Sequence, residues 1–119
     1  MLLYIQGTRE YPPPEWFKEK RYNGQSAEVW SLGILLYTMV CGDVPFRLVK
    51  DILHAKTKFR RELTPGCMNI INQCLIIDSL QRPTLKGMFD NPWVKQVIIA
   101  HSNNNNSSVN YSNNNYFII

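Results

Sequence analysis

The sequence predicts a mainly α-helical domain, and two stretches carry that prediction. The most apolar stretch runs from Val29 to Cys41; Ser26 precedes it, with a hydroxyl that can cap a helix, and Gly42 follows as a stop. A second stretch repeats apolar side chains at helical spacing, namely Met68, Ile71, Cys74 and Leu75. No stretch alternates apolar and polar side chains strongly enough to predict a β-strand.

Length and composition favour one domain with a modest core. The chain has 119 residues, of which 45% are hydrophobic. The stretch from Val29 to Cys41 is shorter than the roughly 20 apolar residues that a membrane span needs, and it contains Ser31, Gly33 and Thr38. We therefore expect a fully buried helix there and no membrane association.

The N-terminal part predicts a loop followed by a short helix. The opening MLLYIQ is apolar but short, and the Pro-rich run TREYPPPEW cannot form a regular ladder because its prolines lack N–H donors. We expect a short helix from Glu15 to Lys20, with Pro14 in its first turn. Residues 22–25 form a polar break before the long apolar helix.

Further helices are predicted in the second half of the chain. After the turn GDVPF, helical spacing predicts a helix over 49–55 and another over 65–77. Thr84 can cap a short helix with the sequence LKGMFD. The dipeptide Asn91-Pro92 then interrupts the pattern, and a helical pattern resumes over 93–100.

The C-terminal end has the composition of a disordered tail. Residues 102–115 are mostly Asn and Ser, which bury too little apolar surface to offset the entropy of ordering the chain. We therefore expect a folded domain over 1–100 and a low-complexity tail over 101–119.

Charge and cysteine usage indicate a protein of a reducing compartment. The chain has 13 Lys and Arg against 9 Asp and Glu, a net charge of +4 that permits acidic partners, and we expect no nucleic-acid binding. The cysteines Cys41, Cys67 and Cys74 are odd in number, lack metal-site spacing and follow no secretory leader. We expect a cytoplasmic location, and a nuclear one is also compatible.

Other reactive or charged residues have simpler interpretations than a site. The thiols of Cys67 and Cys74 are too few for a metal site, so core packing is favoured. His54 and His101 have no carboxylate or cysteine at an informative spacing. A basic run around Phe59 could bind phosphate, but short charge runs are usually solvated faces; it consists of Lys56, Lys58, Arg60 and Arg61.

Four segments, in their order and spacing, carry a family resemblance. GTREYPPPEW, EVWSLGILLYTMVCGDVPF, QRPT and NPWV resemble the second half of a protein kinase catalytic domain. The forms PPEW, VWSLGILLY, MVCGD and PF are most similar to the Pim group of calcium/calmodulin-kinase-like serine/threonine kinases. The resemblance runs from Gly7 to about Val97 and implies the helical C-terminal lobe of the protein-kinase fold.

The resemblance implies a buried ion pair at the C-terminal end of the substrate loop. Pro13, Pro14 and Glu15 occupy the place of the family's Ala-Pro-Glu motif, and Arg82 matches the arginine that pairs with its glutamate. Removing one partner of a buried pair typically costs about 3 to 5 kcal/mol. The implied role is to clamp the substrate loop, which also includes Thr8, a match to the threonine that faces the catalytic aspartate in serine/threonine kinases.

The resemblance assigns roles to further residues. Trp30 belongs to the hydrophobic central helix, and Glu28 takes the place of the aspartate that anchors the catalytic loop. Asp43 is retained as a possible contact for basic substrates, although the family's acidic cluster downstream is replaced by RLVK, with Asp51 as its lone carboxylate. Asn91, Pro92 and Trp93 resemble the family's His-Pro-Trp element.

The motifs that perform phosphoryl transfer do not occur in these 119 residues. There is no GxGxxG loop, no VAIK-like lysine, no HRD with its asparagine and no DFG, so no catalytic, ATP-binding or magnesium-binding residue is predicted. ATP and Mg²⁺ are implied only for the intact family. We expect this chain alone to be inactive, with an apolar surface exposed on the central helix and marginal stability.

Three hypotheses are compatible with these features. The first is a partial serine/threonine kinase of Pim-like type, whose intact relatives transfer phosphate from ATP to protein Ser or Thr. The second is a non-catalytic interaction module that binds a full-length kinase, a protein substrate or a regulator. The third is an incomplete gene product, whose complete form would be an ordinary kinase.

Overall fold

The structure, a computed structural model, describes residues 12–106, and the side chains of 104–106 are not described. It contains helices and no β-strand within that range, which confirms the predicted fold class. The helices are α1 (Pro14–Glu19), α2 (Gly24–Cys41), α3 (Val49–His54), α4 (Pro65–Cys74), a 3-10 turn η1 (Ser79–Gln81), α5 (Leu85–Phe89) and α6 (Pro92–Asn106). No described helix combines the length and apolarity that crossing a bilayer requires.

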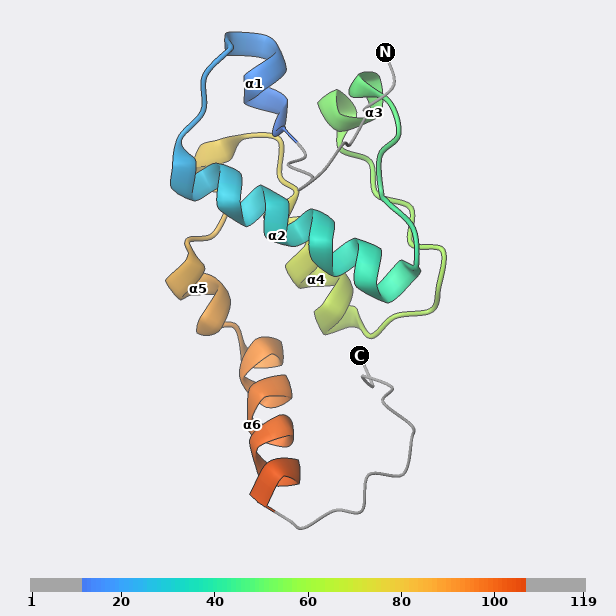
Figure 1. The fold of residues 1–119 in the computed structure, drawn as a ribbon, viewed down its shortest axis with the longest axis vertical. Helices are drawn as coiled ribbons and strands as arrows, with labels where there is room; N and C mark the ends of the chain where they lie inside the picture. The colour runs from blue at the N-terminus through green and yellow to red at the C-terminus, as the bar shows by residue number, and fades with distance from the viewer. Residues whose placement is uncertain (1–11, 107–119) are drawn as a thin grey trace.

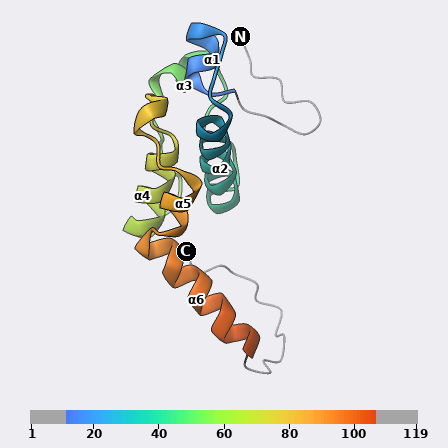
Figure 2. The ribbon, with the colours of Figure 1, turned by 90° about the vertical axis from the view of Figure 1, so that its left-hand side faces the viewer.

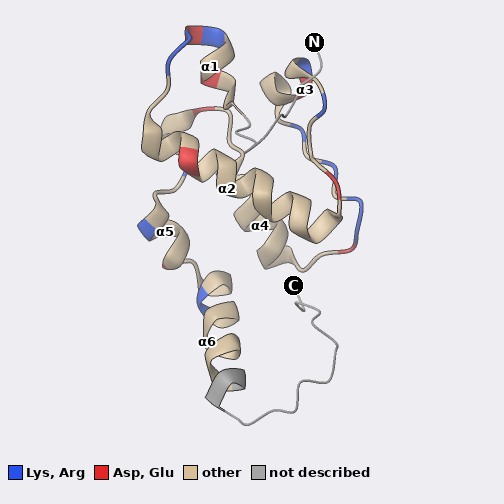
Figure 3. Ribbon diagram, in the orientation of Figure 1, with Lys and Arg blue, Asp and Glu red and all other residues tan. Residues whose placement is uncertain are grey.

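Helix α2 is the centre of the arrangement, and α4 packs along it (Figure 1). The turned view shows α4 and α5 beside α2, while α6 extends away from the other helices (Figure 2). Helices α1 and α3 lie together at one end. Lys and Arg residues are frequent along the edge formed by α3 and its flanking loops (Figure 3).

The core lies where α2, α4 and the loop before α3 meet. Trp30 and Phe46 are buried and stack with their ring centroids 5.8 Å apart. Around them pack fully buried side chains from α2, α3 and α4, namely Val29, Tyr37, Ile52, Cys67, Ile70, Ile71 and Cys74. Burial of this kind supplies most of the stabilisation of a small helical domain.

The start of α2 differs from the sequence prediction. The cap is Asn23, whose Oδ1 accepts from the backbone N–H groups of Gln25 and Ser26 at 3.0 and 3.1 Å. Ser26 is therefore inside the helix, and the prediction that it caps α2 is wrong. Its hydroxyl instead donates to the backbone oxygen of Ser79 at 2.9 Å, a tertiary contact that the local sequence does not reveal.

Three side chains cap helices in the second half of the chain, and of these the Thr84 cap was predicted from the sequence. Thr64 Oγ1 accepts from the N–H of Cys67, and Thr84 Oγ1 accepts from the N–H of Gly87. Asn91, predicted only as an interruption, caps α6 by accepting from the N–H of Trp93 at 2.9 Å. Asn, Thr and Ser are strong caps because a short side-chain oxygen can reach these unpaired donors.

Two helix ends differ from prediction. Helix α4 ends at Cys74 and not at residue 77. The carbonyls of Ile76 and Ile77, which follow the helix, accept from the Arg82 guanidinium. Helix α6 continues to Asn106, so the start of the segment expected to be disordered is helical. Residues 107–119 lie outside the described residues, as do the MLLYIQ run and Thr8.

Because α2 and α4 pack closely at Gly33, this position is sensitive to substitution by a residue with a side chain. A Cβ atom placed on Gly33 would lie 2.5 Å from the Cys74 Cβ and 2.9 Å from a Leu75 methyl. We expect Gly33→Ala to lower the free energy of unfolding by about 1 to 3 kcal/mol, because backbones must shift to admit the methyl group. Urea unfolding followed by circular dichroism measures this.

The matched control is Gly24→Ala, where an added Cβ meets nothing within 4 Å. Its unfolding free energy should stay within about 0.5 kcal/mol of the wild type. Equal effects of the two substitutions would contradict the packing described for α2 and α4.

Candidate functional site

The structure brings Glu15 and Arg82 together in a bidentate ion pair. Arg82 Nη1 donates to Glu15 Oε1 at 2.8 Å, and Nη2 donates to Oε2 at 2.7 Å. The arginine side chain is 0% exposed and the glutamate side chain 11%. The planar fork of arginine matches a carboxylate in this way, and charge-assisted bonds of this kind are strong.

The remaining donors of Arg82 are also satisfied. Nε donates to the Ile76 carbonyl at 2.8 Å, Nη2 to Ile77 at 3.2 Å, and Nη1 to Ser26 at 3.3 Å. With Glu15, these bonds match the five N–H donors of a guanidinium. The charge also lies 5.1 Å from the centroid of the Trp30 ring, which supports it through a cation–π contact.

These contacts connect parts of the chain that are far apart in sequence. Glu15 opens α1, directly after Pro13 and the buried Pro14, and Ser26 lies in the first turns of α2. Ile76 and Ile77 follow α4, while Arg82 follows η1. The pair therefore fixes the C-terminal end of the segment predicted as a substrate loop to the helical core.

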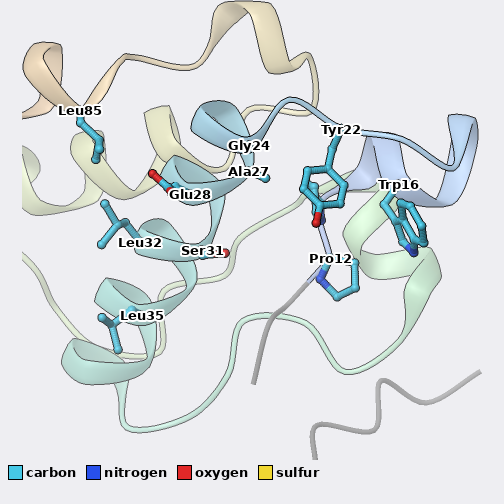
Figure 4. A pocket seen from close by; sticks show the side chains of 11 residues that line it. Pro12, Trp16, Tyr22, Gly24, Ala27, Glu28, Ser31, Leu32, Leu35 and Leu85 are labelled. Atoms are coloured by element: carbon cyan, nitrogen blue, oxygen red, sulfur yellow. The ribbon is translucent and has the colours of Figure 1, made fainter. Parts of the chain in front are cut away.

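A groove lies beside α1 and along one face of α2 (Figure 4). Its volume is about 960 Å³. Trp16 and Tyr22 line one end with an edge-to-face ring contact at 5.8 Å, and Leu32 and Leu35 line the other end. The apolar surface expected on the central helix is present, since Leu35 and the neighbouring Met39 are 54% and 60% exposed.

Glu28 lies in this groove, where it was predicted to anchor a catalytic loop. Its side chain projects from α2 between Ala27 and Leu32 on the groove wall (Figure 4). It is exposed and has no hydrogen bond or ion pair to any residue in the described range. The carboxylate is thus available to accept hydrogen bonds from a segment that fills the groove.

Asp43, predicted as a contact for basic substrates, is already engaged. Its Oδ2 accepts from Arg47 at 2.6 Å and from Arg60 at 2.8 Å, and its Oδ1 accepts from the Val44 N–H at 2.8 Å. The Val44 N–H, and then the Arg47 guanidinium, lower the pKa of the Asp43 carboxyl. A substrate arginine would have to compete with two arginines of the chain itself.

No group of three or more His, Cys, Asp or Glu in the described part of the chain is arranged to hold a metal ion. Thr8 lies outside the described residues. The carboxylates nearest the groove are used by Arg82 or, in the case of Glu28, stand alone on α2.

Some site contacts were missed by reasoning from sequence. The pairing of Asp43 with Arg47 could have been found from their i,i+4 spacing. The bond from Arg60 to Asp43 and the carbonyls that accept from Arg82 carry no local signal, because they depend on how α4 and its following turn pack.

Because Glu15 and Arg82 form a buried ion pair, we expect removal of the Glu15 carboxylate to lower the stability of the fold strongly. Glu15→Gln would leave the buried Arg82 charge unpaired, so we expect the free energy of unfolding to fall by about 3 to 5 kcal/mol. Thermal and urea unfolding measure this, with Glu19→Gln as the control. Glu19 is exposed at the end of the same helix, and its substitution should cost less than about 0.5 kcal/mol.

Because the thiols of Cys67 and Cys74 are buried, we expect the fold to lose stability at alkaline pH. Burial raises the pKa of Cys67 to about 11 and of Cys74 to about 12, from 9.0 for a free thiol. Because the thiol pKa is higher in the folded state than in the unfolded state, the neutral thiols stabilise the fold below pH 9. This contribution is lost as the pH rises from 9 toward the pKa of the folded state.

We therefore expect unfolding free energy to fall between pH 9 and 11, and to fall less steeply in Cys74→Ala, by about 1 kcal/mol per pH unit. Alanine keeps the Cβ of residue 74, so the contact with Gly33 is retained. Identical pH slopes in the two proteins would show that the Cys74 thiol ionises in the folded state as it does in water.

Comparison with known proteins agrees with this geometry. The model of the protein kinase domain matches residues 3–94. The serine/threonine-protein kinase pim-2 of Danio rerio is 42% identical over 96 residues, covering 81% of this chain and 31% of the relative. The serine/threonine-protein kinase prk-2 of Caenorhabditis elegans is 44% identical over 100 residues, covering 81% and 23%.

A more distant relative is the maternal embryonic leucine zipper kinase of Xenopus tropicalis, 33% identical over 101 residues, with 80% of this chain and 16% of the relative covered. The chain thus spans a third or less of the length of these relatives, whose coverage is 31%, 23% and 16%. The resemblance to Pim-type kinases seen in the sequence is confirmed by these matches. The chain belongs to the protein kinase domain family, and its described residues form helices of the C-terminal lobe of that fold.

Proposed function

We propose that this chain is the substrate-side part of a serine/threonine protein kinase of Pim-like type. The observation that carries the proposal is the Glu15–Arg82 pair, which holds the end of the Thr8–Glu15 loop against the helical lobe. Kinase relatives at 42% and 44% identity support the family assignment behind it.

The proposed role of these residues is to position the protein substrate. Phosphoryl transfer depends on placing a hydroxyl and a phosphate in line, and small misplacements of the substrate cost large factors in rate. Arg82 fixes Glu15, Glu15 fixes the start of α1, and α1 fixes the two prolines that end the loop. A protein substrate would then meet a loop whose base cannot shift without exposing a buried charge.

Glu28 and the groove complete the proposed role. A segment carrying the catalytic residues would lie along the apolar face of α2 and offer backbone N–H groups to the Glu28 carboxylate. ATP and Mg²⁺ would supply the phosphate and neutralise its charge in the whole kinase. The sequence of 119 residues contains no motif that would hold either one.

The open groove also favours a second function, that of a non-catalytic interaction module. A face with Leu35 and Met39 exposed is a suitable binding surface for a full-length kinase, a protein substrate or a regulator. Capture of a defined kinase by the wild-type chain, and loss of that capture in Leu35→Asp, would support the module. A cytoplasmic or nuclear location is compatible with both functions.

Kinase activity is best tested in a chimera. The 119-residue chain would replace the matching segment of the Danio rerio pim-2 kinase, and phosphate transfer from ATP to a serine peptide would be measured. We expect transfer by the chimera, and a loss of about 100-fold in kcat/KM with Glu15→Gln, because the loop is displaced.

Glu19→Gln in the same chimera should retain activity within about twofold, since an exposed side chain at the end of α1 makes no contact that would be lost. The chain alone should transfer no phosphate. Transfer by the purified chain, or an active Glu15→Gln chimera, would overturn the proposal.

A further inference from the structure

A basic surface lies on the loop between α3 and α4, away from the groove and from the Glu15–Arg82 pair. Residues 56–61 read KTKFRR, with four cations and no carboxylate, and Glu62 follows. The loop runs along the outer edge of the molecule (Figure 3). We call Lys56, Lys58, Arg60 and Arg61 the basic strip.

The loop has the alternating exposure of an extended chain. Lys56, Lys58 and Arg60 are exposed, whereas Thr57 and Phe59 between them are partly buried. Residues two apart in an extended chain are separated by about 7 Å along one side. Lys56, Lys58 and Arg60 therefore present positive charges toward solvent at regular intervals, and the exposed Arg61 follows them.

The inward side chains fix this arrangement to the core helices. Thr57 Oγ1 donates to Asn72 Oδ1 on α4 at 2.8 Å, and the Phe59 ring lies 5.8 Å from the Tyr37 ring on α2. The Tyr37 hydroxyl donates to the backbone carbonyl of Lys58. A loop held in this way gives up little conformational entropy when a partner binds.

Few acidic side chains neutralise the positive charge of the basic strip. Asp43 accepts from Arg60 and from Arg47, so one carboxylate is shared by two arginines. Lys56, Lys58 and Arg61 make no ion pair with any residue of the described range. A fixed row of cations in which only Arg60 has an acidic partner among the described residues attracts an anionic partner.

The side chains favour a polypeptide over a nucleic acid as that partner. Surfaces that bind single-stranded nucleic acid combine cations with aromatic rings on which bases stack. Phe59 is the aromatic residue of the KTKFRR loop, and its ring is turned inward onto Tyr37. Within this loop, no ring is left to receive a base between the cations.

We propose that the basic strip is a docking surface for an extended acidic protein segment with carboxylates at alternate positions. Successive side chains on one side of such a segment have the same spacing as Lys56, Lys58 and Arg60. This surface is separate from the proposed substrate loop, so the inference does not depend on kinase activity.

Fluorescence anisotropy of labelled peptides tests the proposal on the 119-residue chain. A twelve-residue peptide alternating Glu and Ser would be compared with an equally charged peptide whose Glu residues are contiguous, and with a Gln–Ser peptide. We expect the alternating peptide to bind best, and its affinity to fall as salt rises from 50 to 200 mM.

The variants locate the surface. Lys56→Gln with Lys58→Gln should weaken binding by about three- to tenfold, as expected for losing two exposed charge contacts, and Lys56→Arg with Lys58→Arg should restore it. Lys86→Gln with Lys95→Gln removes the same charge from α5 and α6 and should leave binding within about twofold.

Some outcomes would overturn the proposal. These are equal weakening by both Gln pairs, no binding of the alternating peptide at 50 mM salt, or binding no tighter than that of the contiguous peptide. Tighter binding of a twelve-nucleotide oligouridine would instead identify a nucleic-acid surface. Both Lys positions are exposed, and unchanged circular dichroism would show that the variants are folded.

Discussion

The structure depends on how one buried arginine is satisfied. Arg82 is 0% exposed, so its guanidinium has lost its water and must find every donor a partner in the protein. It does so with the Glu15 carboxylate of α1 and three backbone carbonyls, one from the first turn of the central helix and two from the segment after α4. A buried pair contributes little net stability compared with apolar packing, but it is intolerant of displacement because any shift leaves a charge unpaired. This explains how a small lobe can hold the end of a loop in one position.

The same requirement shapes the local structure around the pair. Helix α4 ends at Cys74, and the carbonyls of Ile76 and Ile77 that follow it accept from the Arg82 guanidinium. The Ser26 hydroxyl bonds the Ser79 carbonyl, which ties the start of α2 to η1 beside the arginine. The groove is lined by Trp16, the residue after Glu15, and by Ala27, the residue after Ser26, so the ion pair and the open surface are close to each other.

Much of this could be predicted from the sequence, for identifiable reasons. The central helix has a long apolar run ended by Gly42, whose φ of 76° in the structure suits glycine, and Thr84 caps α5 as its side chain allows. The pairing of Glu15 with Arg82 came from the family resemblance, because their separation of 67 residues carries no local signal. The cap at Asn23 is a local signal that the sequence prediction missed, because Ser26 was taken as the cap. The bond from Arg60 to Asp43 and the carbonyls that accept from Arg82 could not be predicted, since they depend on tertiary packing.

The central claim is that Glu15 and Arg82 act as one unit, and a double-mutant cycle tests it most directly. Unfolding free energies of the wild type, Glu15→Gln, Arg82→Met and the double variant would be measured by urea titration. If the two side chains form a buried pair, the double variant should be more stable than the sum of the single effects predicts, by about 2 kcal/mol or more. Effects that add to within about 0.5 kcal/mol would mean that the two charges are independent, and would contradict their action as one unit.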